Sequence, residues 1–202
     1  MEIFASLNPE LVKWAVSRYE ASPDHAHGME HILAVAHEAR EIAHAFDLDP
    51  EPMLLAALLH DVFSHVDREQ HHLLASDWVL DNLGRYGYDA GVTSRVAKMC
   101  LEHRASGKDL YPDIYCEAFS AADRGPLTIE GFVRRMLKWP EDRTNLVRLD
   151  EVVSHTKEKH SRGKGYARPN QVHAEFYASS LDKFYQDVES LDVARVLEIM
   201  GD

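Results

Sequence analysis

The chain has 202 residues and a formal net charge of −12 at pH 7. Its length suits one domain with a sizeable core. The excess of acidic residues argues against bulk nucleic-acid binding, because phosphate backbones are held by lysine and arginine. No apolar stretch is long enough to span a bilayer, and Met1–Phe4 lacks the basic and apolar regions of a secretory signal. We therefore expect a cytoplasmic protein without a membrane partner, in which Cys100 and Cys116 are reduced core thiols.

Apolar residues recur every three or four positions along most of the chain, which predicts helix nearly throughout. Asn8-Pro9 opens the first predicted helix, Asp49-Pro50 precedes the third, and Trp139-Pro140 closes the seventh. Because the connections are short, we expect a compact all-α fold of packed neighbouring helices. The predicted helices span residues 8–21, 28–46, 51–64, 69–84, 89–105, 112–123, 126–139, 142–160, 169–186 and 190–200.

The pair His60-Asp61 ends the apolar run Met53–Leu59, inside a helix that is apolar almost all round. Such a helix belongs in the middle of a domain. Burying a carboxylate beside an imidazole is costly unless something compensates, and a metal ion compensates best. The pair therefore indicates a metal site.

Three other helices also bring a polar residue to an apolar face. His31 lies at the edge of the inward stripe of the second predicted helix, and His103 comes last on the buried face of the fifth. Asp123 follows the small pair Ala121-Ala122. One inward histidine is more often a hydrogen-bonded core residue than a ligand, but the combination favours a metal. Imidazoles with carboxylates suit Zn, Mn, Fe, Co or Ni, and Mg if few nitrogens are used.

The ordered pattern of His31, the doublet His60-Asp61 and then Asp123 resembles the HD superfamily of metal-dependent phosphohydrolases. The resemblance covers roughly residues 22–125 and implies one HD domain over 1–202. That domain would be a multi-helix bundle, with its metal-binding core at about 22–125 and a C-terminal helical extension at about 126–202. The segments that carry the resemblance are Asp24–Val35, Ala56–Asp61, Cys100–His103 with Gly107, and Ala121–Asp123.

The resemblance implies that His31, His60, Asp61 and Asp123 hold one divalent ion. Some branches of the family hold a second ion, for which His71 or His72 together with His103 would serve. This chain has Arg104 after His103 where the two-metal cyclic-dinucleotide phosphodiesterases have a second histidine. It also has Ser64 where the nucleotidase-like branch has glutamate. The substrate therefore stays open.

The implied activity is hydrolysis of a phosphate ester of a nucleotide or another small phosphorylated metabolite by a metal-activated water. Asp61 would orient that water, and His65, Asp67 or His27 would protonate the leaving oxygen. Cationic residues would hold the phosphate oxygens. The basic stretch 155–169 is either a mobile phosphate-binding flap or a solvated loop. The candidate phosphate-binding residues are Arg104, Lys108, Arg124 and Lys164.

Two other classes of function remain open. The first is a mixed-valent di-iron oxygenase, since relatives of this fold use the same histidines and aspartates around two irons. It needs both extra histidines as ligands. The second is a catalytically idle nucleotide-binding domain, which the apparently complete ligand set argues against. The sequence is silent on oligomeric state.

Overall fold

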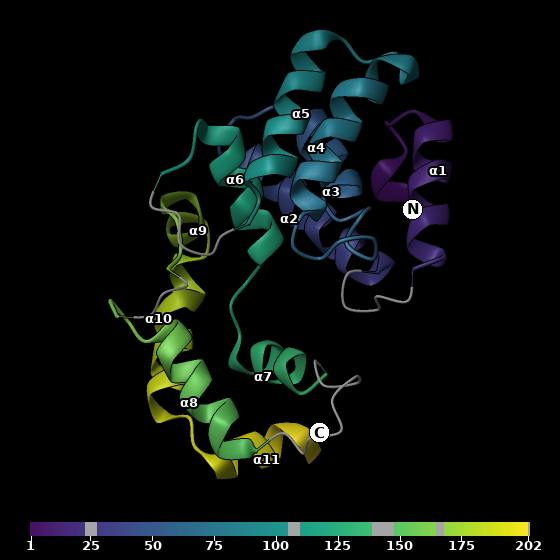
Figure 1. The fold of residues 1–202 in the computed structure, drawn as a ribbon. Helices are drawn as coiled ribbons and strands as arrows, with labels where there is room; N and C mark the ends of the chain where they lie inside the picture. Colours follow the sequence, from purple (N-terminus) through teal and green to yellow (C-terminus); the bar gives the residue numbers. More distant parts are fainter. Residues whose placement is uncertain (23–27, 105–109, 139–147, 165–167, 202) are drawn as a thin grey trace. The chain divides into compact units, whose positions relative to one another are not determined.

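The computed structural model describes residues 1–22, 28–104, 110–138, 148–164 and 168–201. These residues contain no strand, which confirms the all-α class (Figure 1). None of the described helices combines the length and apolar character of a membrane span. The helices are η1 (Glu2–Phe4), α1 (Pro9–Glu20), α2 (Met29–Ala45), α3 (Pro50–Leu59), α4 (His71–Asn82), η3 (Leu83–Tyr86), α5 (Ala90–Glu102), α6 (Ile114–Arg124), α7 (Ile129–Lys138), α8 (Leu149–His160), α9 (Gln171–Phe176), α10 (Ala178–Ser190) and α11 (Val193–Gly201).

Side-chain caps set the starts of several helices, as the sequence predicted for the first and third. The Asn8 side chain accepts hydrogen bonds from the first backbone N–H groups of α1, and Asp49 does the same for α3. Asp89 and Asp113 cap α5 and α6 in the same way. Each cap satisfies N–H groups that the helix itself leaves unpaired.

Most predicted helices differ from the observed ones by one to three residues at an end, and two differ more. The helix predicted over 51–64 ends at Leu59, because the chain then tightens into turns with bonds to the third residue back, such as Ser64 N–H to the Asp61 carbonyl. The helix predicted over 169–186 is broken at Tyr177 into α9 and α10, and α10 runs on to Ser190. Periodicity missed the break because apolar residues continue on both sides of it. Residues 142–147 of another predicted helix lie outside the described residues.

The chain divides into two compact units, Met1–Gly125 and Pro126–Asp202. The division follows Gly125, which ends α6 with a positive φ of 63° that glycine adopts readily. That the whole chain is one domain stays a prediction.

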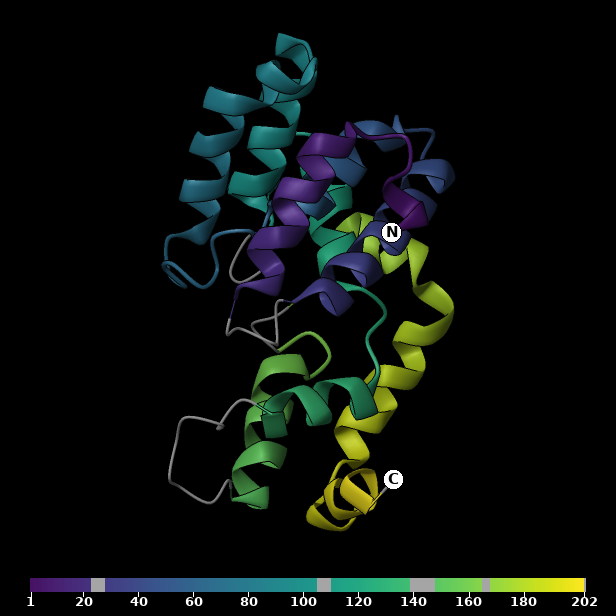
Figure 2. The ribbon, with the colours of Figure 1, turned by 90° about the vertical axis from the view of Figure 1, so that its right-hand side faces the viewer.

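In the first unit, α3 is the central helix. Every residue from Pro52 to Leu59 is buried, and α3 packs against α2, α5 and α6. Figures 1 and 2 both show α4 running beside α5. The stripe predicted to face inward on α2, which contains Ile32 and Ile42, is fully buried. The helices that carry the candidate ligands therefore meet around one enclosed helix.

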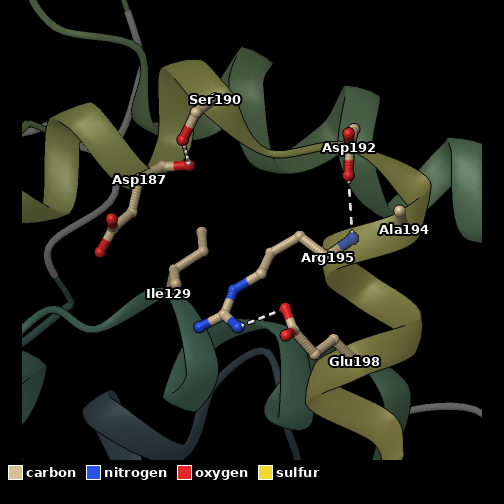
Figure 3. A pocket seen from close by; sticks show the side chains of 7 residues that line it. All are labelled: Ile129, Asp187, Ser190, Asp192, Ala194, Arg195 and Glu198. Carbon is tan, nitrogen blue, oxygen red and sulfur yellow. Dashed lines mark hydrogen bonds and ion pairs between the residues drawn. The ribbon is translucent and has the colours of Figure 1, made fainter.

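The second unit has its own core, formed by α7, α8, α10 and α11 (Figure 2). A hollow of about 530 Å³ lies on it, lined by residues of α7, α10 and α11 (Figure 3). Arg195 crosses this hollow and pairs at 2.6 Å with Glu130 of α7 and with Glu198 of its own helix. The charged groups there thus join α11 to α7. The buried residues of this core are Ile129, Val133, Val152, Phe184, Val188, Leu191, Val196 and Ile199.

Truncating α3 tests its central place. Leu55 is fully buried, so Leu55→Ala should lower the free energy of unfolding by about 2–5 kcal/mol through lost burial and a residual cavity. Leu80, which is 55% exposed on α4, is the control, and Leu80→Ala should change stability little. Urea denaturation followed by circular dichroism measures both. Equal effects would contradict the central role of α3.

Candidate metal centre

The His60-Asp61 doublet lies where α3 ends, and both residues are almost completely buried. This corrects the expectation that the doublet lies within a helix. His60 caps α3, and Asp61 begins the turns that follow. The Tyr19 hydroxyl of α1 donates a hydrogen bond of 3.0 Å to the Leu58 carbonyl, one of the carbonyls that a helix end leaves unpaired. Tyr19 thereby fixes the backbone that presents the doublet.

The four residues predicted to hold one ion converge in the structure. His31 Nε2 lies 3.2 Å from Asp123 Oδ1 and 3.6 Å from Asp61 Oδ2. His60 Nε2 lies 3.4 Å from Asp61 Oδ2 and 3.5 Å from Asp123 Oδ1. These side chains come from α2, α6 and the end of α3. They bring two imidazole nitrogens and two carboxylate oxygens to one point.

A second group meets the other oxygen of Asp61. His71 Nε2, at the start of α4, lies 3.1 Å from Asp61 Oδ1. His103 Nε2, just past the end of α5, lies 3.9 Å from that oxygen and 3.1 Å from His71 Nε2. The Asp61 carboxylate thus faces one histidine pair with each oxygen. The sequence left His71 and His72 as alternatives, and the structure brings His71, not His72, to Asp61.

Three of these imidazoles are oriented by their own backbone. His60 Nδ1 donates to the Ala57 carbonyl at 3.1 Å, and His71 Nδ1 donates to the Arg68 carbonyl at 2.9 Å. His103 Nδ1 donates to the Cys100 carbonyl at 2.7 Å. A carbonyl oxygen can only accept, so each Nδ1 carries the proton. In a neutral ring Nε2 is then the lone-pair atom, which is the arrangement found in metal-ligating histidines.

The charges at the centre reinforce one another. Burial by itself lowers the pKa of His60, but Asp61 and Asp123 outweigh it and raise the pKa to about 10. Burial by itself raises the pKa of Asp61, but the charge of His60 holds it well below its ordinary value. Burial by itself also raises the pKa of Asp123, but the interactions with His31 and His60 hold that pKa well below its ordinary value. Burial and the charge of His60 lower the pKa of His103 to about 4. Two ionised carboxylates therefore surround one imidazolium.

The donor set fits a divalent ion. His60 Nε2 and Asp61 Oδ1 are buried without a hydrogen bond of good geometry, although ring nitrogens and carboxylate oxygens lie 3.1–3.5 Å from them, an arrangement that a cation would stabilise. His31, His60 and Asp61 form one group whose ligand atoms lie within 4.8 Å of one another, and Asp61, His71 and His103 form another. Nitrogen and oxygen donors of this kind suit Mn, Fe, Co, Ni or Zn.

The predicted proton donors lie on the segment after the doublet. His65 is half-buried in the turns that follow Asp61. Asp67 Oδ1 accepts hydrogen bonds from the backbone N–H groups of Glu69 and Gln70, so this carboxylate shapes the turn before α4. Their role as general acids stays a prediction. His27 lies outside the described residues.

The predicted phosphate ligands are scattered. Arg124 is half-buried at the end of α6, next to Asp123 in sequence. Arg104 is exposed and donates Nη1 to the Glu69 carbonyl at 3.0 Å. Lys164 is exposed in the second unit, and Lys108 lies outside the described residues. In the basic stretch 155–169, α8 continues to His160. The phosphate-binding roles stay predictions.

Sequence reasoning missed the groups that orient the ligands. The hydrogen bonds from a histidine Nδ1 to the backbone carbonyl three residues earlier depend on the orientation of the ring, and residue spacing does not show that orientation. The Tyr19 bond joins residues 39 positions apart. A tyrosine on the buried face of α1 was the available signal, and it does not distinguish a hydrogen-bonded hydroxyl from ordinary core packing.

The fold and the cluster together define an all-helical protein with a candidate His/Asp metal centre. Residues 28–126, which contain every member of the cluster, match the family model of the HD domain. This part of the chain is therefore an HD domain, as its resemblance indicated.

The structure also resembles a solved protein. The crystal structure of a predicted HD superfamily hydrolase from an uncultured Thermotogales bacterium matches 90% of this chain and 90% of its own, with a TM-score of 0.54. The sequences are 20% identical, so the match concerns the fold. No curated protein gave a significant match.

Metal binding should depend strongly on pH. A pKa of about 10 means that His60 carries a proton on Nε2 at neutral pH, and a metal must displace that proton. Apparent affinity for Mn²⁺ should therefore rise about tenfold per pH unit from about pH 6 to about pH 8. Asp61 and Asp123 are already ionised in that range, and His103 is already neutral.

Isothermal titration calorimetry with Mn²⁺ measures this dependence. Repeating the titration in buffers of different ionisation enthalpy counts the protons released. Release of about one proton per first ion is expected. Binding that neither varies with pH nor releases protons would contradict the assignment of His60 as a ligand.

Proposed function

We propose that the chain is a divalent-metal-dependent phosphohydrolase that cleaves a phosphate ester of a nucleotide or another small phosphorylated metabolite. The observation that supports it best is the Asp61 carboxylate with a histidine pair at each oxygen. The HD domain and the fold shared with a predicted HD superfamily hydrolase agree with hydrolysis.

His31, His60, Asp61 and Asp123 would hold the ion, with His71 and His103 available for a second. When bound, a divalent ion lowers the pKa of a water molecule and polarises a phosphoryl oxygen. Asp61 is proposed to orient that water, and the position of its carboxylate in both donor groups supports this role. Burial of the doublet keeps bulk water away, which strengthens electrostatic interactions there.

The other roles in this proposal belong to residues near the centre. His65, four residues after Asp61, is our first choice to protonate the leaving oxygen, with Asp67 second. Arg124 is proposed to bind a phosphate oxygen because it follows Asp123 directly at the end of α6. Lys108 and Lys164 are further candidates.

The test is phosphate release from a panel of nucleotides and small phosphate esters with added Mn²⁺. Asp61→Ala should lower the rate by at least about a hundredfold, more than is typical of residues that only support metal ligands. Asp77, exposed on α4, gives the matched control Asp77→Ala, which should keep full activity. Circular dichroism should show that both variants keep the helical fold.

Two results would count against the proposal. Full metal occupancy in folded Asp61→Ala would refute the ligand assignment. Absence of phosphate release across the panel, from folded and metal-loaded protein, would refute hydrolysis of these substrates. A nucleotide bound without turnover would then favour the catalytically idle binding domain.

A di-iron oxygenase is the second candidate, and the second donor group favours it. A second ion could be bound beside the first by Asp61 Oδ1, His71 and His103. Iron-loaded protein poised at half reduction should then show the electron paramagnetic resonance signal of an Fe(II)–Fe(III) pair. His103→Gln should remove that signal. A hydrolase that works with one ion should keep phosphate release in His103→Gln.

A further inference from the structure

The turn that leads into α4 determines where His71 points. Asp67 Oδ1 accepts hydrogen bonds from the N–H groups of Glu69, at 2.9 Å, and Gln70, at 3.0 Å. This is the local bonding by which aspartate stabilises turns. The carbonyl of Arg68, inside the turn, accepts the His71 Nδ1 proton. The orientation of the His71 ring therefore depends on the shape of this turn.

Arg104 connects that turn to the end of α5. It follows His103 directly, and its Nη1 donates to the Glu69 carbonyl at 3.0 Å across 35 positions of sequence. The Glu69 carbonyl is next in the chain to the Arg68 carbonyl that holds His71. A guanidinium donor is charged, so this bond is stronger than one between neutral groups. The two histidines of the second donor group are thus joined through their neighbours.

The two histidine rings also meet each other. Their Nε2 atoms lie 3.1 Å apart, at hydrogen-bond distance, and each Nδ1 donates to a backbone carbonyl. A divalent cation bound by both rings would need the lone pair of each Nε2 and would replace that hydrogen bond. The backbone that carries the rings must then keep both Nε2 atoms close to Asp61 Oδ1.

We propose that Arg104 is a positioning residue: its bond to the Glu69 carbonyl holds His71 beside His103 and so sets the affinity of the second donor group for a divalent cation. The proposal rests on the proposed function in that it concerns the same metal centre. It assigns to Arg104 a role different from the phosphate binding expected from its place in the sequence. Arg104 acts through His71 and touches neither ion nor substrate.

The two roles predict different losses. A positioning residue affects the second ion and leaves the first ion, held by His31, His60, Asp61 and Asp123, unchanged. A phosphate ligand affects the KM for substrate and leaves both ions unchanged. Metal binding measured without substrate therefore separates them.

The experiment is titration of the full chain with Mn²⁺, followed by calorimetry and by the electron paramagnetic resonance signal of a coupled manganese pair. The variants are Arg104→Ala, Arg104→Lys, which keeps a charged donor, and Asp67→Ala, which removes the turn bonds. Arg85→Ala is the control, because Arg85 is also exposed and lies in η3, outside the centre. Circular dichroism checks the fold of each.

In Arg104→Ala we expect an unchanged first ion, a second ion bound at least about tenfold more weakly, and a reduced coupled-pair signal. Asp67→Ala should act in the same direction. Arg104→Lys should restore most of the second-ion affinity, and Arg85→Ala should match the wild type.

Three results would overturn the proposal. They are unchanged second-ion binding in Arg104→Ala, a raised KM with both ions retained, and a wild type that binds a single ion. Phosphate release measured on the same samples tests the proposed function separately. Loss of the second ion in a protein that never releases phosphate would support the role of Arg104 and refute the hydrolase.

Discussion

The side chain of Asp61 is 4% exposed and ionised, and the rest of the first unit is arranged around that constraint. A buried carboxylate is tolerated when cations or proton donors face it. The charged imidazole of His60 does so here, and three further imidazoles, from α2, α4 and the end of α5, surround the carboxylate. The enclosed α3 carries the carboxylate into the core, and the helices around it bring the histidines. The same arrangement that makes the buried carboxylate of Asp61 tolerable also makes it a candidate metal ligand.

The sequence was most informative where a polar residue interrupted an apolar pattern. His60-Asp61 after seven apolar residues, and Asp123 after Ala121-Ala122, could be identified because burial of such groups needs a reason. Helix starts at Asn8 and Asp49 followed from their capping chemistry. The end of α3 at Leu59 and the break at Tyr177 could not be predicted from the sequence, because the hydrophobic periodicity continues through both positions. Adjacent His71 and His72 could not be separated by spacing, since the choice depends on the turn that precedes them.

The second unit contributes its own core, with Arg195 joining α7 and α11 through two acidic partners. Such pairs, at partly exposed side chains, add little stability individually. The structural match spans 90% of the chain, so it extends beyond the HD domain into this unit.

The direction of the helices at the centre adds an effect of its own. α3, α5 and α6 end there, at Leu59, Glu102 and Arg124, whereas α2 and α4 begin there. Each helix end carries about half an elementary charge from its aligned peptide dipoles, negative at the C-terminus and positive at the N-terminus. Three negative ends against two positive ones leave a small surplus of negative potential. The backbone itself thus favours a cation at this point, before any carboxylate is considered.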